Sequence, residues 1–176
     1  MNTESRLMEM LTGYAAAHQH PFNITVHLIG IPIIMLGVLI PLSWLSFDVL
    51  GFSTNLAYMA VTVLFLFYMT LDTVFALVFL VVGIAIAKLA TLLGVLPANV
   101  SGTIAATAFF GGYILQFVGH AVEKSMPVIL KHPIQANLAA PFFTVVEVSG
   151  LLGLRKELFA AVQASIAEHR ADEKEA

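Results

Sequence analysis

Long apolar blocks separated by short polar breaks dominate the chain. The blocks cover residues 24–45, 55–70, 73–94 and 101–122. Each approaches the length of about 20 residues at which an apolar helix spans the hydrocarbon core of a bilayer. The pattern therefore predicts an all-α integral membrane protein with about four transmembrane helices. Glycines in the last block predict close contact with a neighbouring helix: Gly102, Gly111, Gly112 and Gly119.

Two polar breaks define where these helices end. Residues 46–54, SFDVLGFST, predict a turn-like connection. The apolar stretch 55–96 is too long for one crossing, and Asp72 is its only acid, so we expect a turn at Asp72. Pro32 and Pro41 lie inside the first block, where membrane helices tolerate proline.

The first block is preceded by residues 3–19, which predict a short amphipathic helix. Its apolar positions fall at helical spacing and suit a membrane surface: Leu7, Met10, Leu11 and Tyr14. Pro21 interrupts this helix, and Asn23 is a favourable N-cap for the next one. No secretory signal is evident, so we expect the first apolar block to be retained as a spanning helix.

The end of the chain differs from the apolar blocks. Residues 138–153 are apolar but short, which predicts an interfacial or re-entrant helix. The residues from 155 onwards are charged and are expected to project into water. The chain is therefore interpreted as one membrane-embedded domain, residues 1–158, followed by a charged tail, residues 159–176.

Composition supports the membrane assignment and excludes several kinds of site. The 176 residues are 59% hydrophobic and 11% charged, whereas a soluble domain has about 25% charged residues. The mean hydropathy is +0.92. A net charge of -3 gives no support for nucleic-acid binding. The absence of cysteine excludes thiolate nucleophiles, disulfides and cysteine metal sites.

Lysine and arginine are distributed unequally across the membrane. With four crossings, both termini and the region after the last span lie on one side. That side holds most of the cations: Arg6, Lys124, Lys131, Arg155, Lys156, Arg170 and Lys174. The opposite loops, 46–54 and 95–100, hold no lysine or arginine. The one exception to this distribution is Lys88, which lies toward the far end of the block 73–94. We therefore expect both termini in the cytoplasm, in the inner membrane of a bacterium or the endoplasmic reticulum of a eukaryote.

Histidines gather at this cytoplasmic side. His18, His20 and His27 lie within YAAAHQHPFNITVHLIGIP, residues 14–32, and His120 ends the fourth block. An imidazole in hydrocarbon is costly unless it has a partner. His18 and His27 would face opposite ways on an unbroken helix, but a bend at the intervening proline can bring them together. The sequence therefore predicts that His18, His27 and His120 converge.

Polar neighbours of these histidines suggest a metal site. Gln116, His120 and Glu123 share one helical face, and a carboxylate can orient a metal-bound imidazole. Glu147 is the only charge in residues 138–153, so a functional role is the default hypothesis. Imidazole and carboxylate ligands without thiolates fit iron, zinc or copper. The residues alone thus indicate a metal site at the cytoplasmic face of a helical bundle.

These residues also form two motifs that resemble those of a membrane family long catalogued as a domain of unknown function. Its fungal member is an endoplasmic-reticulum 2-hydroxy fatty acid dioxygenase that needs ferrous iron. The first motif comprises Tyr14, His18, Pro21, Asn23, His27 and Pro32. The second comprises residues 116–120 (QFVGH), Glu123, Pro127, residues 140–143 (APFF) and Glu147. The resemblance covers about residues 10–158.

The chain departs from the family pattern at two positions. Two residues separate His120 from Glu123, where the pattern has three, although both spacings keep the carboxylate on the same helical face. His132 stands where asparagine is expected. No metal role is therefore assigned to His132.

The resemblance implies an iron-dependent dioxygenase that shortens 2-hydroxy fatty acids by one carbon in α-oxidation. Such an enzyme consumes dioxygen and releases carbon dioxide, and its acyl substrate lies among the membrane helices. The resemblance assigns ferrous iron to His18, His27 and His120. It assigns substrate binding to Tyr14, Asn23 and Gln116, and ligand orientation or proton transfer to Glu123 and Glu147.

Other function classes stay open from the sequence. A membrane zinc hydrolase of a lipid ester or amide would use nearly the same residues. Paired histidines in a helical bundle also hold haem in electron-transfer subunits. A small transporter or scaffold could use histidine as a pH sensor. The sequence is compatible with a homo-oligomer and does not define its size.

Overall fold

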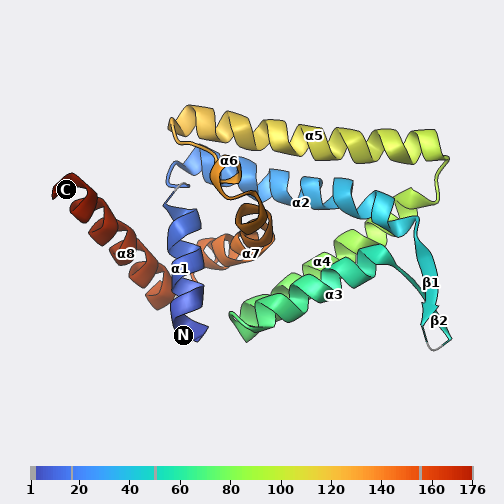
Figure 1. The fold of residues 1–176 in the computed structure, drawn as a ribbon, viewed down its shortest axis with the longest axis horizontal. Helices are drawn as coiled ribbons and strands as arrows, with labels where there is room; N and C mark the ends of the chain where they lie inside the picture. Colours follow the sequence, from blue (N-terminus) through green and yellow to red (C-terminus); the bar gives the residue numbers. More distant parts are fainter. Residues whose placement is uncertain (1–2, 17, 50, 155, 176) are drawn as a thin grey trace.

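A computed structural model describes residues 3–16, 18–49, 51–154 and 156–175 of the chain. Its described part is 82% helical and contains eight helices and one two-stranded hairpin (Figure 1). The predicted all-α membrane fold is confirmed. The elements are α1 (Thr3–Ala15), α2 (Pro21–Ser43), β1 (Ser46–Val49), β2 (Phe52–Asn55), α3 (Leu56–Met69), α4 (Thr73–Gly94), α5 (Ala98–Glu123), α6 (Val128–Lys131), α7 (Pro133–Leu151) and α8 (Lys156–Glu175).

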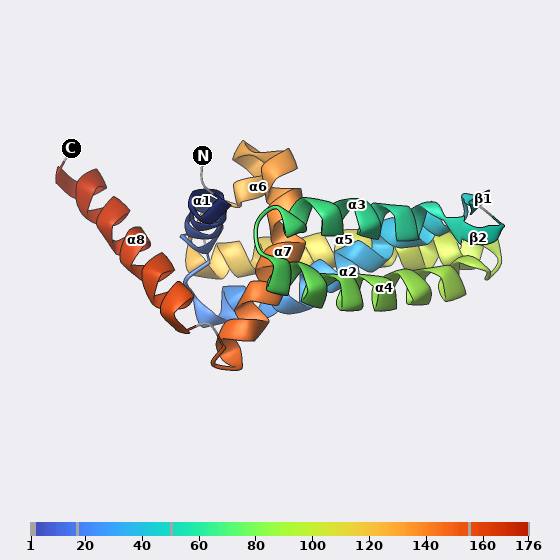
Figure 2. The same ribbon diagram turned by 90° about the horizontal axis from the view of Figure 1, so that it is seen from below.

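The helices form an elongated bundle with its two ends differently built. α2 and α5 lie side by side along the long axis, and α3 and α4 form an antiparallel pair packed on α2 (Figures 1 and 2). The β1–β2 hairpin lies at one end of the bundle. At the other end, α7 packs on α2, α4 and α1, and α1 and α8 pack against each other. Both termini are therefore at the end opposite the hairpin.

Glycine permits the close packing of α2 on α5. A Cβ atom on Gly112 would lie 2.5 Å from Ile34 Cγ1 and 2.9 Å from the carbonyl oxygen of Gly30. Gly119 is equally crowded, because its Cβ would meet the side chains of Asn23 and Val26. The two other glycines predicted to make close contacts do not, since nothing lies within 4 Å of a Cβ at either: Gly102 and Gly111. The prediction holds for the two glycines that face α2.

Three of the four predicted spanning helices are long enough to cross a membrane, whereas the one predicted at 55–70 is not. Among the described residues, four helices are long and apolar enough to cross a membrane: α2, α4, α5 and α7. α3 is apolar but only 14 residues long. α7 reaches 19 residues because it begins at Pro133, before the predicted start at 138. α7 lies at a steep angle to the other long helices (Figure 2). Its interfacial or re-entrant placement stays a prediction.

The break predicted at 46–54 is confirmed, and its described residues add a detail that was not predicted, because β1 and β2 form an antiparallel hairpin. Ser46 pairs with Asn55 and Val49 with Phe52. Gly51 supplies the positive φ of 84° that such a tight turn requires. The turn predicted at Asp72 is confirmed. Its side chain caps α4 by accepting a hydrogen bond from the Phe75 amide at 3.0 Å.

The N-terminal cap of α2 is also corrected. The helix begins at Pro21, so Asn23 lies in its first turn and does not cap it. His20 is the cap, because its Nδ1 accepts a hydrogen bond from the Phe22 amide at 3.2 Å. Proline at the first helical position needs no amide partner, which moves the helix start ahead of the predicted cap.

The two terminal helices bury apolar faces in protein. α1 ends at Ala15, earlier than predicted, and its Leu7 and Leu11 belong to the core instead of facing lipid headgroups. The tail is likewise helical, and its Val162 and Ile166 are buried in the same core. The expectation that the tail only projects into water is therefore wrong for the first half of α8. Four cations of the orientation argument have side chains outside the described part: Arg6, Arg155, Arg170 and Lys174.

Candidate metal centre

Three histidines from separate parts of the chain meet at the terminal end of the bundle. His18 lies between α1 and α2, His27 lies in α2, and His120 lies in the last turn of α5. One potential ligand atom from each lies within 4.8 Å of the others. The side chains are buried, with 2%, 1% and 4% of their surface exposed. The predicted convergence is confirmed, whereas the identity of a bound metal stays a prediction.

Backbone carbonyls select the tautomer of two of these imidazoles. The Nδ1 of His18 lies 2.7 Å from the carbonyl oxygen of Tyr14, and the Nδ1 of His27 lies 2.9 Å from that of Asn23. A carbonyl can only accept, so each Nδ1 carries the proton and donates it. Each Nε2 is therefore left as a lone-pair donor. Metal-bound histidines commonly use their second nitrogen in this way.

One of these nitrogens provides a direct test of the metal hypothesis. The Nε2 of His18 is buried and has no hydrogen-bond partner among the described residues. Leaving a buried acceptor unpaired costs free energy. A cation among the three rings would supply the missing partner, so the residues present fit a metal.

His120 is oriented by a side chain that the sequence analysis did not single out. Its Nδ1 lies 2.8 Å from Ser125 Oγ. α5 ends at Glu123, and Lys124 adopts the left-handed region with φ 58°. This turn brings the chain back, so that the Ser125 amide donates to the carbonyl of His120 at 3.1 Å. In the sequence, the only indication of this contact was that the fourth apolar block ends close to His120, so that the following residues can turn back toward it.

The surroundings keep the centre neutral. Burial, and to a smaller extent the neighbouring His27, lower the pKa of His18 from 6.5 to about 3. His18 is therefore uncharged at neutral pH, which is the form that binds metals. The triad includes no carboxylate. A divalent cation bound there would retain its positive charge and attract an anionic group such as a carboxylate.

Glu123 joins two helices and does not bond to an imidazole. Its Oε1 accepts hydrogen bonds from the amides of Gln19 at 2.7 Å and His20 at 3.2 Å, and its Oε2 accepts one from Asn23 Nδ2. The carboxylate thus ties the start of α2 to the end of α5. Because the Asn23 carbonyl holds His27, Glu123 positions that imidazole indirectly. The prediction that Glu123 orients an imidazole directly is not what this geometry shows.

Aromatic rings hold His18 from the other side. The Tyr14 ring stacks on the His18 imidazole with centroids 4.2 Å apart and planes 6° from parallel. Phe143, the last residue of the APFF stretch, packs against both rings. Its ring centroid lies 4.4 Å from that of Tyr14 and 5.6 Å from that of His18. α1 and α7 therefore complete a centre whose ligands come from the loop, α2 and α5.

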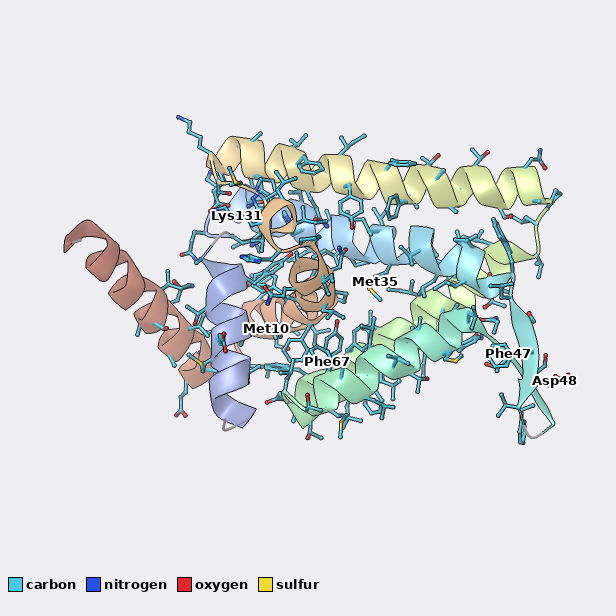
Figure 3. The ribbon with its side chains drawn as sticks, viewed as in Figure 1. Met10, Met35, Phe47, Asp48, Phe67 and Lys131 are labelled. Atoms are coloured by element: carbon cyan, nitrogen blue, oxygen red, sulfur yellow. The ribbon has the colours of Figure 1, made fainter. Side chains whose placement is uncertain are left out.

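An elongated cavity of about 210 Å³ begins at the three histidines. Tyr14 and Gln116 line it, as predicted for substrate-binding residues, whereas Asn23 does not. Along α2 its wall runs from His27 to Leu39, about 18 Å at 1.5 Å per residue. Most of the other lining residues are apolar, and they come from α2, α3, α5, α6 and α7. Figure 3 shows Met35, one of the lining residues, between α2 and α3.

Glu147 lies away from this cavity. It is half-buried on α7 and lines a small separate cavity with Gln163 of α8. Phe143 borders that small cavity and also contacts the His18 ring, so it stands between the two. The structure does not bring Glu147 together with the histidines, and its catalytic role stays a prediction.

Comparison with known proteins identifies one family. A family model described as 2-hydroxy-palmitic acid dioxygenase Mpo1-like matches residues 5–152. The match includes the three histidines and every other residue assigned to the site from the sequence. Neither the curated proteins nor the solved structures contain a match to the chain.

Proposed function

Because the chain belongs to the 2-hydroxy-palmitic acid dioxygenase Mpo1-like family, we propose that it shortens 2-hydroxy fatty acids by one carbon in an iron-dependent reaction. The observation that carries the proposal is the histidine triad at the end of an apolar cavity. The cavity offers a polar end for the reacting group and an apolar length for an acyl tail. This combination suits an amphiphilic acid.

The proposed reaction balances without an added reductant. One 2-hydroxy acid and one dioxygen give the acid shortened by one carbon, one carbon dioxide and one water. The carbinol carbon is oxidised to the new carboxyl group, the bond to the old carboxyl carbon breaks, and dioxygen is reduced. The substrate itself therefore supplies all the electrons, and no reductase partner is needed.

His18, His27 and His120 would hold the ferrous ion. When bound, such an ion supplies dioxygen activation and a positive charge for the substrate carboxylate. Tyr14 and Gln116 line the histidine end of the cavity, where they would orient the hydroxyl and carboxylate groups of the substrate. The apolar walls would bind the tail and exclude water from the reacting end.

The proposal is tested with His120→Ala, because His120 is buried in the triad. We expect iron affinity and oxygen consumption with a 2-hydroxy fatty acid to fall by at least about 100-fold. Loss of a residue that only supports a metal ligand already costs about 10- to 100-fold, and loss of the ligand itself should cost more. His132→Ala is the matched control, because this histidine is exposed and outside the triad. Full iron content and full activity in His120→Ala would refute the proposal.

The same preparations distinguish the alternatives. A zinc hydrolase would contain zinc after anaerobic purification and would consume no oxygen. Haem ligation by two imidazoles places one on each face of the ring, whereas these rings contact one another with centroids 4.3 to 5.0 Å apart. The geometry therefore disfavours haem, and a Soret band would contradict this conclusion.

A further inference from the structure

The cavity that begins at the histidines reaches the place where α2 and α3 converge. Figure 1 shows α3 approaching α2 toward the hairpin and diverging from it toward α7. The cavity wall at the converging end contains Val38 and Leu39 of α2 and Ala60 and Val61 of α3. An acyl chain whose head lies at the triad would therefore have its terminal methyl near these residues.

Two of these residues form a fixed wall. Leu39 and Val61 are 4% and 1% exposed and belong to the protein core. Val61 also packs closely against α4, because a Cβ on Gly83 would lie 2.7 Å from Val61 Cγ1. Enlarging either residue would disturb the core, so neither can be varied without affecting the fold.

Ala60 differs from its neighbours in size and placement. It is half-buried, it lines the cavity, and only a methyl group separates its backbone from the open space. A larger side chain at this position would extend into the cavity. The length available to an acyl chain at this end therefore depends on residue 60.

We propose that Ala60 determines acyl-chain-length specificity by leaving room for the end of the tail. This inference rests on the proposed function for the position of the head group. With the head anchored at the triad, each added methylene advances the tail toward Ala60. Each methylene that is buried contributes about fourfold in affinity, and one that finds no space loses this gain.

The test compares Ala60→Leu and Ala60→Val with the natural protein. Met59→Phe is the control, because Met59 is the preceding residue of α3, is 43% exposed and does not line the cavity. Iron-loaded protein in detergent is kept anaerobic to prevent turnover. Dissociation constants are measured for a series of straight-chain 2-hydroxy fatty acids and for the corresponding plain fatty acids, by displacement of a fluorescent fatty acid.

We expect Ala60→Leu to raise the dissociation constants of the longest acids by about fourfold for each displaced methylene. The shortest acids should bind as they do to the natural protein. Ala60→Val should give a smaller shift, and Met59→Phe none. Unchanged binding of short acids also shows that each variant is folded. An unaltered chain-length profile in both Ala60 variants, or equal weakening of short and long acids, would overturn the proposal.

The experiment separates this inference from the proposed function. If the variants shift the profile of plain fatty acids but no 2-hydroxy acid is turned over in air, the role of Ala60 stands and the proposed reaction falls. If 2-hydroxy acids are turned over with the same chain-length profile in all variants, the reaction stands and the role of Ala60 falls.

Discussion

At the scale of single residues, each imidazole of the triad is held by its Nδ1 atom. Two of the three Nδ1 partners are backbone carbonyls, so the backbone itself sets the tautomers of His18 and His27. Only His120 depends on a side chain, the hydroxyl of Ser125. Ser125 is therefore the one Nδ1 partner that a substitution can remove.

Ser125→Ala should weaken iron binding without removing a ligand. The loss of a hydrogen-bond partner behind a metal-bound histidine costs about 10- to 100-fold in affinity. Ser125→Thr keeps the hydroxyl and should bind iron within a few-fold of the natural protein. Competition with a coloured chelator measures both values. Equal affinities for Ser125→Ala and Ser125→Thr would remove Ser125 from the site.

Glu123→Gln tests the carboxylate that joins α2 to α5. The carboxylate accepts three N–H hydrogen bonds, and hydrogen bonds to charged groups contribute about 1.5–3 kcal/mol each. We expect a lower melting temperature and weaker iron binding, because His27 depends on Asn23. Glu157→Gln, at an exposed carboxylate of α8, should change neither. Wild-type melting and iron affinity in Glu123→Gln would show that its charge is unimportant.

The stability of the metal-free protein should depend on pH through His18. Its pKa is about 3 in the folded protein, against 6.5 for a histidine exposed to water. Between these values the unfolded chain binds the extra proton, so stability is fully present above pH 6.5 and decreases as the pH falls. The decrease is at most about 1.4 kcal/mol per pH unit. Melting curves of His18→Gln should show a shallower dependence, and an identical one would exclude His18 as its source.

At the scale of elements, the α2–α5 contact sets the distance between His27 and His120. Gly112 meets α2 directly, whereas the adjacent Gly111 faces open space. The same substitution at the two positions should therefore have opposite effects. Alanine in an exposed helical position is favoured over glycine by about 0.5–1 kcal/mol.

Gly111→Ala should maintain or raise the melting temperature, whereas Gly112→Ala should lower it. The new methyl at Gly112 would lie 2.5 Å from Ile34 and 2.9 Å from the Gly30 carbonyl, so the helices must separate. Iron affinity should fall in Gly112→Ala alone, because His120 moves with α5. Similar melting and iron binding in the two variants would show that this contact does not hold the centre together.

At the scale of the whole molecule, the histidine centre lies at the end that carries the termini, α6 and α8, away from the hairpin (Figures 1 and 2). Three lysines follow α5 in the part of the chain that contains α6, α7 and α8: Lys124, Lys131 and Lys156. The segments that connect helices at the hairpin end have no lysine or arginine. By the positive-inside rule, the proposed orientation puts the metal centre at the cytoplasmic face.

Cysteine labelling tests this orientation without background, because the chain has no cysteine. Ser53→Cys in the hairpin and Lys131→Cys in α6 are both at exposed positions. In intact cells or sealed vesicles of known orientation, an impermeant maleimide should label them from opposite sides of the membrane, with Lys131→Cys on the cytoplasmic side. Labelling of both from one side, or the reverse arrangement, would contradict the proposed topology.

The sequence by itself determined the membrane class and the meeting of the three histidines. Apolar blocks of spanning length require helices, because lipid offers no partner for backbone amides and carbonyls. Their alternating direction then places His18, His27 and His120 at the same end of the bundle, with Pro21 beginning the helix that follows His18. These conclusions depend only on element length and order.

The tertiary structure alone decided what surrounds the histidines. The partners of Glu123 lie about 100 residues away in the chain, and Glu147 points to a cavity shared with α8. The apolar faces of α1 and α8 could have met lipid, but they bury each other's surface instead. An amphipathic pattern shows that a face must be covered without saying by what, because apolar burial is non-directional. Which helix covers which face also set the walls of the cavity, and with them the role proposed for Ala60.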